Sequence, residues 1–230
     1  MENLNVIFED NHIIVVEKPV NIPSQGDKTG DTDMLTIIKK YLIEKYNKPG
    51  DAYLGLIHRL DRPVGGVMVF AKTSKAAGRL SEQVRNKEFS KKYLVIVDGK
   101  LDEKTGLFED YLVKNEKTNL SRVTDSKNKN AKKASLDYEV IKYNEETNLS
   151  LVKVNLHTGR HHQIRVQFSS RGHSIYGDQK YGTRGRGKQI CLWAYSLTIK
   201  HPITKEEMTF KKVPEVIGSW MILEDTELVK

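Results

Sequence analysis

The feature that most constrains the fold is a succession of strand-like segments in the second half of the chain. Residues 93–97, 107–113, 136–142 and 149–156 fit strands, and several of them alternate apolar and polar side chains. Because no helix-like segment stands between each strand and the next, a mixed or antiparallel sheet is favoured. We therefore expect a mixed α/β chain of the α+β kind.

The first half adds a short strand and two helices. Residues 13–16 fit a strand, and residues 31–46 and 74–87 carry apolar side chains at helical spacing. Pro49-Gly50 ends the first helix. The chain of 230 residues can bury one sizeable core, and no linker or internal repeat is evident. We expect a single domain over residues 1–230.

Residues 55–66, with the sequence GLIHRLDRPVGG, suggest chemistry. Asp61 stands between Arg59 and Arg62, and the apolar run 67–71 after the Pro/Gly turn fits a buried strand. Asp61 is thus expected on a loop where two strands meet. Flanking positive charge favours an ionised carboxylate, which on a rigid loop is a candidate nucleophile. The alternative is a surface ion pair in a tight turn.

A second polar motif follows about a hundred residues later. Residues 158–166 read TGRHHQIRV, and residues 172–182 include Gly177-Asp178 and Tyr181-Gly182. The pattern predicts a helix that Thr158 caps and Gly172 ends. On it, Arg165 would lie about one turn from His161 and His162. The alternative is a basic surface helix.

The charge balance indicates a polyanionic partner. The formal net charge is +8 and the pI is about 9.3, which suits RNA or DNA, although a merely basic protein is the alternative. Two basic segments, residues 114–133 and 182–188, are expected to be loops or a solvated hairpin end that contacts phosphates. The basic residues of the first are Lys114, Lys117, Arg122, Lys127, Lys129, Lys132 and Lys133.

Several classes are disfavoured. His157, His161 and His162 lie near one another, but no Cys pair or carboxylate stands beside them at ligand spacing, so no metal site is expected. The single Cys191 favours a reducing compartment. No apolar run reaches membrane-spanning length, and the N-terminus has no signal-peptide core, so cytoplasm is the expected location. A monomer is the default expectation.

Taken together, the motifs resemble the RluA family of RNA pseudouridine synthases. The matching features are HRLD at 58–61, TGRHHQIR at 158–165, GD-x-x-YG at 177–182, Lys91-Lys92-Tyr93 and His201-Pro202. The resemblance runs from about residue 6 to about residue 214. It implies a long bent sheet with the active cleft across its middle. It also implies isomerisation of uridine to pseudouridine in RNA, without cofactor or metal.

The resemblance also implies roles for individual residues. Asp61 would be the nucleophile, Arg165 its compensating cation, and Tyr93 a ring for the flipped base with a hydroxyl near the proton lost from carbon 5. Arg59 would enter the space that the uridine leaves. Candidate RNA contacts are His58, Arg59, Arg62, Lys91, Arg160, His162, Gln163 and Ile164.

Three departures from the family pattern concern the finer substrate contacts. Val64-Gly65-Gly66 replaces the usual Thr-Ser-Gly, Glu17-Lys18-Pro19 replaces Asn-Lys-Pro, and Trp193 replaces His. The family-like strand begins within ten residues of Met1, so the extra N-terminal RNA-binding domain of many members is not expected. Ribosomal and transfer RNA are both open as substrates. A catalytically silent RNA-binding factor and an RNA hydrolase remain alternatives.

Overall fold

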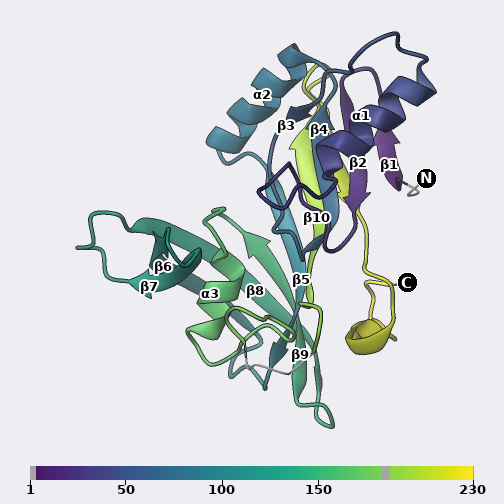
Figure 1. The fold of residues 1–230 in the computed structure, drawn as a ribbon. Coiled ribbons are helices and arrows are strands. Elements are labelled where there is room, and N and C mark those ends of the chain that lie inside the picture. Colours follow the sequence, from purple (N-terminus) through teal and green to yellow (C-terminus); the bar gives the residue numbers. More distant parts are fainter. Residues whose placement is uncertain (1–3, 183–186, 230) are drawn as a thin grey trace. The chain divides into compact units, whose positions relative to one another are not determined.

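The chain folds into two compact units (Figure 1). The computed structural model describes residues 4–182 and 187–229. Unit 1 contains residues 4–90 and 194–212, and unit 2 contains residues 91–182, 187–193 and 213–229. The chain passes between the units inside β5 (Ser90–Asp98), inside β10 (Leu192–Lys200) and again after Lys212. The single domain expected over residues 1–230 stays a prediction.

Unit 1 is built on antiparallel strand pairs. β2 pairs with β1 on one side and with β4 on the other, β3 pairs with β4, and β10 pairs with β11. The strands are β1 (Val6–Glu9), β2 (Ile13–Lys18), β3 (Gly55–Leu56), β4 (Gly65–Ala71) and β11 (Glu207–Lys211). Every residue of β4 is buried, which confirms the buried strand predicted after the Asp61 motif.

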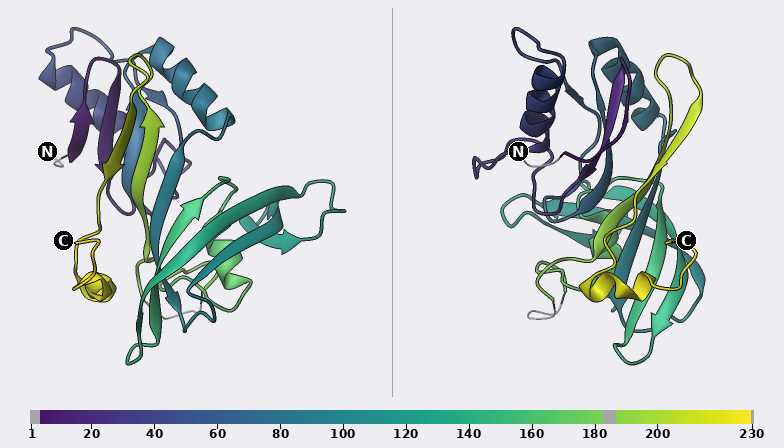
Figure 2. Two further views of the ribbon diagram at one scale, coloured as in Figure 1. Left: turned by 180° about the vertical axis from the view of Figure 1, so that it is seen from behind. Right: turned by 90° about the vertical axis from the view of Figure 1, so that its right-hand side faces the viewer.

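Two helices cover the strands of unit 1 on opposite sides (Figure 2). They are α1 (Met34–Lys45) and α2 (Ser74–Arg85). Both predicted helices are confirmed, but α1 begins at residue 34, because the Asp33 side chain accepts the N–H of Thr36 and caps the helix there. Ala76 and Leu80 of α2 pack on alternate residues of β2 and β4, as the two-residue period of strands requires.

Unit 2 is an antiparallel sheet in the order β5-β9-β8-β6-β7. The strands after β5 are β6 (Thr105–Asn115), β7 (Leu120–Thr124), β8 (Lys132–Asn144) and β9 (Leu149–Leu156). The four strands predicted from the sequence are all present, and the α+β class is confirmed. A short 3-10 helix, η1 (Gly218–Leu223), belongs to the same unit.

The basic segment 114–133 forms the end of the β6–β7 hairpin, as one of the two expectations had it, but it also contains strand β7, which the sequence did not predict. The polar composition of the segment hid this strand, which has apolar side chains only at Leu120 and Val123. Val123 packs against Leu112, Ala134 and Val166, and this tertiary contact secures a strand that local pattern does not indicate. The second basic segment includes residues 183–186, which lie outside the described residues.

The helix of the second motif is shorter than predicted, because it begins at Gln163. α3 spans Gln163–Ser169, and its N-cap is His162 in the left-handed region, with φ of +54° and no side-chain cap. Thr158 is therefore not the cap. Its hydroxyl instead accepts the Ser135 N–H and donates to Gln163 Oε1. Gly172 has a φ of +82°, in agreement with the predicted stop.

Candidate active site

The Asp61 loop joins β3 to β4 in unit 1, as predicted. The residue before Asp61 is fixed at both of its backbone groups by one buried side chain. Ser24 Oγ donates to the Leu60 carbonyl at 2.8 Å and accepts the Leu60 N–H at 3.1 Å. The Val64 N–H donates to the Asp61 carbonyl at 2.9 Å and closes the turn. The backbone that carries Asp61 is thus held on both sides, which keeps a reacting side chain in place.

Lys18 lies beneath this loop and is fully buried. Its Nζ donates to the carbonyls of Pro19, at 2.8 Å, and Arg62, at 3.1 Å. Burial lowers the pKa of Lys18 to about 7, although attraction to Asp61 opposes the shift and repulsion from Arg62 adds to it. Sequence reasoning missed this residue. Its signal was a lysine at the end of a strand whose first four residues are apolar.

The described side-chain partners of Arg62 lie on the loop of residues 27–31, whereas the sequence suggested a pairing with the neighbouring Asp61. Its guanidinium forms ion pairs with Asp31 and Asp27 and donates to Thr29 Oγ1 at 3.1 Å. It therefore ties the 27–31 loop to the turn after Asp61. The adjacency of Arg62 and Asp61 in sequence did not reveal these partners, because Asp27 and Asp31 are more than thirty residues away.

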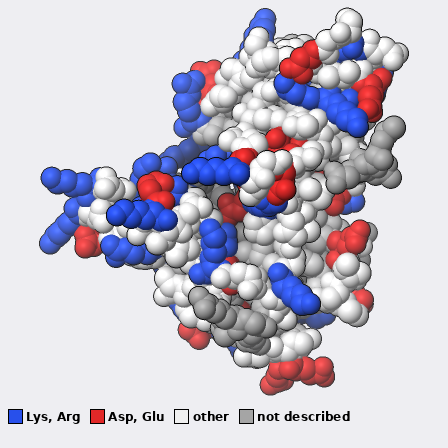
Figure 3. Space-filling view, in the orientation of Figure 1, with Lys and Arg blue, Asp and Glu red and all other residues white. Residues whose placement is uncertain are grey.

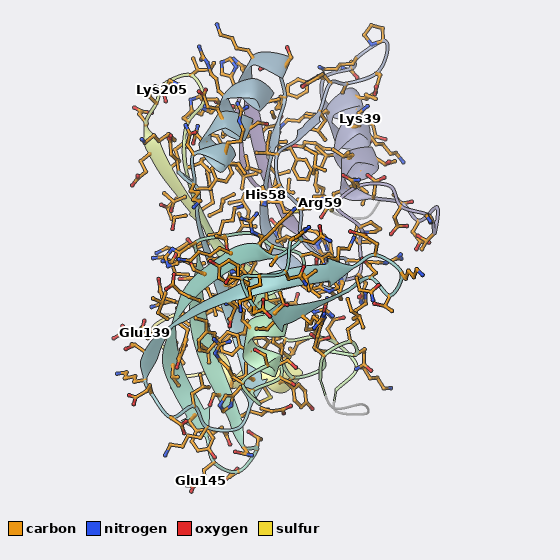
Figure 4. The ribbon with its side chains drawn as sticks, turned by 90° about the vertical axis from the view of Figure 1, so that its left-hand side faces the viewer. Lys39, His58, Arg59, Glu139, Glu145 and Lys205 are labelled. Carbon is orange, nitrogen blue, oxygen red and sulfur yellow. The ribbon has the colours of Figure 1, made fainter. Side chains whose placement is uncertain are left out.

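Arg59 is exposed between two anchored neighbours (Figure 4). On one side, His58 Nε2 accepts the Val69 N–H at 3.3 Å, and its ring lies edge-on to Phe89 at 6.2 Å. On the other side, Leu60 is held by Ser24. Both neighbours fix the backbone while the guanidinium of Arg59 faces solvent. This placement suits a side chain that must reach into a nucleic acid.

In unit 2 the loop before α3 is organised by Gln163, a predicted RNA contact. Its Oε1 accepts hydrogen bonds from the Thr158 hydroxyl and the Arg160 N–H, and its Nε2 donates to the Ser135 carbonyl. Arg160 Nε donates to the Lys133 carbonyl. Gln163 is only 3% exposed, so its contacts shape the loop. Ile164, another predicted contact, is also buried.

Arg165 is buried on α3 and forms a two-pronged ion pair with Asp178. Its Nε and Nη2 reach the two carboxylate oxygens at 2.7 Å each. Burial alone would raise the pKa of Asp178, but the Arg165 guanidinium and the N–H groups of Lys180 and Tyr181 hold it below its ordinary value. The sequence offered Asp178 only as part of a motif, and the fold makes it the partner of Arg165.

Tyr93 and Lys91 lie on β5. Tyr93 is opposite Val154 in the β5–β9 ladder and is 7% exposed. Lys91 is half-buried, and burial lowers its pKa. The structure thus brings predicted residues together in two sets. Unit 1 holds Asp61 with the neighbouring Arg62 and the unpredicted Lys18, and unit 2 holds Tyr93, Lys91, Arg165 and the α3 loop.

Two further observations concern metals and membranes. Within residues 4–182 and 187–229, no three His, Cys, Asp or Glu side chains are grouped as a metal ion requires. In the same part of the chain, no helix has the length and apolar character needed to span a membrane.

The sequence pattern and the fold define a class of enzyme. Residues 12–170 match the family model for RNA pseudouridylate synthases, and the chain belongs to this family. The predicted resemblance is confirmed. The enzyme is an isomerase that converts uridine in RNA to pseudouridine.

Individual relatives place the chain within the family. It is 31% identical to the dual-specificity RNA pseudouridine synthase RluA of Haemophilus ducreyi, over 92% of this chain and 93% of that protein. It is 33% identical to an uncharacterized RNA pseudouridine synthase of Aquifex aeolicus, over 95% of this chain and 73% of the relative. The structure of human RNA pseudouridylate synthase domain containing 4 shares the fold, with a TM-score of 0.77 and 23% identity over 92% of this chain and 89% of that one.

Proposed function

We propose that this enzyme isomerises a uridine of structured ribosomal or transfer RNA, with Asp61 as the nucleophile. The observation that carries the proposal is the clamped Asp61 loop, in which Ser24 fixes Leu60 while Arg59 faces solvent. Relatives named as the dual-specificity synthase RluA and as ribosomal large subunit pseudouridine synthase C support the choice of RNA.

The remaining roles follow the family resemblance. The uridine leaves the base stack, and Arg59 fills its place with a planar guanidinium that can stack on the neighbouring bases. The ring of Tyr93 stacks on the flipped uracil, and its hydroxyl takes part in loss of the proton from carbon 5. Arg165 balances negative charge in the reaction, a role supported by its permanent charge, while its pairing with Asp178 fixes the position of the guanidinium. We assign the remaining predicted contacts to binding of the RNA, with the side chains of His58, Arg62, Lys91 and Arg160 meeting the RNA and the buried His162, Gln163 and Ile164 shaping the loop before α3. The proposal includes no cofactor and no metal.

Tritium release from carbon 5 of labelled uridine tests the nucleophile. We expect wild-type protein to release tritium from ribosomal or transfer RNA, and Asp61→Ala to release none while it retains RNA binding. Asp51→Ala is a suitable control, because this carboxylate is also on unit 1 but is exposed, and its described contacts are the ion pair with Lys39 and a hydrogen bond from the Ala52 N–H. Turnover by purified Asp61→Ala would refute the role of Asp61.

The same assay separates the alternative of a catalytically silent RNA-binding factor. If the protein is such a factor, the wild-type protein binds RNA and releases no tritium from any RNA fraction. If release occurs, fractions of purified ribosomal and transfer RNA from cells that lack the gene identify the substrate, because their target uridine is still unmodified.

A further inference from the structure

Tyr181 connects the buried Arg165 to the β6–β7 hairpin, and all the residues concerned belong to unit 2. The carbon of the Arg165 guanidinium lies 5.2 Å from the centre of the Tyr181 ring. A guanidinium over an aromatic face is attracted by the ring electrons. Asp178 therefore holds one edge of the guanidinium by hydrogen bonds, and the guanidinium lies over the face of the Tyr181 ring.

The backbone of Tyr181 is fixed to the same carboxylate that binds Arg165. The N–H groups of Lys180 and Tyr181 donate to Asp178 Oδ1 at 2.8 Å and 3.2 Å. The Tyr181 carbonyl accepts hydrogen bonds from the hydroxyls of Ser169, in α3, and Ser174. The ring is consequently held in a defined position relative to Arg165.

The hydroxyl of Tyr181 extends the connection to two other segments. It accepts the Ser121 N–H of β7 at 2.7 Å and lies 2.8 Å from His162 Nδ1. The Tyr181 oxygen accepts a hydrogen from Ser121 and is also hydrogen-bonded to Nδ1 of His162, and the tautomer of the His162 ring sets which of the two groups donates in that second bond. His162 occupies the strained left-handed region at the start of α3.

A second contact joins the same segments. His161 Nδ1 is 2.9 Å from Ser121 Oγ, and the rings of His161 and His162 are 3.7 Å apart between centroids. One tyrosine side chain thus contacts Arg165, the N-cap residue His162 and the basic hairpin.

We propose that Tyr181 is a positioning residue for the isomerase reaction, acting on Arg165 through its ring and on the α3 loop and hairpin through its hydroxyl. The inference rests on the proposed role of Arg165.

Tyr181→Phe tests this inference, because it keeps the ring over Arg165 and removes the hydroxyl. We expect kcat to fall about tenfold, since small displacements of a reacting group have large effects on rate, while the Kd for RNA stays within about twofold. Tyr143→Phe is the matched control, because it also removes a hydroxyl that donates to one described partner, Asn148 Oδ1. The control should keep the wild-type kcat. An unchanged kcat in Tyr181→Phe would overturn the inference.

A measurement without turnover separates this inference from the proposed function. In ¹⁵N NMR the Nε–H of Arg165, assigned by its loss in Arg165→Lys, should exchange with solvent at least about fivefold faster in Tyr181→Phe than in wild type. Equal exchange would contradict the positioning role, even if the wild-type enzyme proved inactive. Inactive wild type with faster exchange in Tyr181→Phe would count against the proposed function alone.

Should Tyr181→Phe not fold, His162 provides a second test of the hydroxyl connection. Asn tolerates the left-handed backbone and offers an acceptor near the position of Nδ1, whereas Ala offers neither. His162→Asn should retain at least about fivefold more kcat than His162→Ala. Equal rates for these two variants would refute the connection.

Discussion

At the residue scale, the protein accommodates two buried cations in different ways. The permanent charge of Arg165 is balanced by the carboxylate of Asp178, which accepts two short hydrogen bonds from it. Lys18 has two backbone carbonyls as described hydrogen-bond acceptors, and burial lowers its pKa to about 7. A neutral amine has two N–H groups and can satisfy both carbonyls, so the uncharged form fits this position.

Lys18 gives a prediction for the pH dependence of stability. Between pH 7 and its ordinary pKa of 10.5, the unfolded chain keeps the Lys18 proton while the folded protein releases it. The free energy of unfolding should therefore rise with pH across this window, by up to about 1.4 kcal/mol per pH unit from this group. Urea unfolding at pH 7 and 9.5 should show a smaller rise in Lys18→Met.

Lys48→Met is the control for that comparison, since Lys48 is exposed after the end of α1. This variant should follow the wild-type dependence on pH. A Lys18→Met protein with the same rise as wild type would mean that Lys18 stays charged in the folded state.

At the scale of elements, the β6–β7 hairpin and the turn before β8 carry a concentration of positive charge (Figure 3). Two of its lysines have carboxylate partners, Lys114 with Glu116 and Lys133 with Glu109. The basic residues are Lys114, Lys117, Arg122, Lys127, Lys129, Lys132 and Lys133. The hairpin is held by the pairing of β6 with β8, so its charges are presented from a fixed base.

We expect the basic turn between β7 and β8, together with the first two residues of β8, to contact RNA phosphates. Changing Lys127, Lys129, Lys132 and Lys133 to Gln should weaken binding and reduce the slope of log K against log salt, by about 0.7–0.9 for each phosphate that the variant no longer neutralises. Filter binding over a salt series measures this slope. The control changes Lys48, Lys75, Lys87 and Lys205, which are exposed in unit 1, and removes the same total charge. If both sets of substitutions alter the slope equally, the turn between β7 and β8 has no special role in RNA binding.

At the scale of the whole molecule, the net charge of +8 opposes close approach of two copies. We therefore predict a monomer of 26.3 kDa in solution. Light scattering after size exclusion, at low and at physiological salt, measures the mass directly. A mass near twice this value at both salt concentrations would contradict the prediction.

The sequence predicted the elements well where their residues form a local pattern. The alternation in residues 149–156 identified β9, and the four-residue spacing of Ala76, Leu80 and Val84 identified α2. It failed at β7 and at the start of α3. These two segments are stabilised by contacts with distant residues, Val123 with Leu112 and Gln163 with Ser135, which a local window does not include.

By itself, the sequence determined the family, the α+β class and the position of Asp61 on a loop between two strands. Only the tertiary structure decided which groups hold that loop and Arg165. Ser24 and Lys18 support the Asp61 loop from 36 and 44 residues away, and Asp178 and Tyr181 hold Arg165 across a turn. Residue order fixes patterns along a strand or helix, whereas partners of a buried charge are set by which segments pack together.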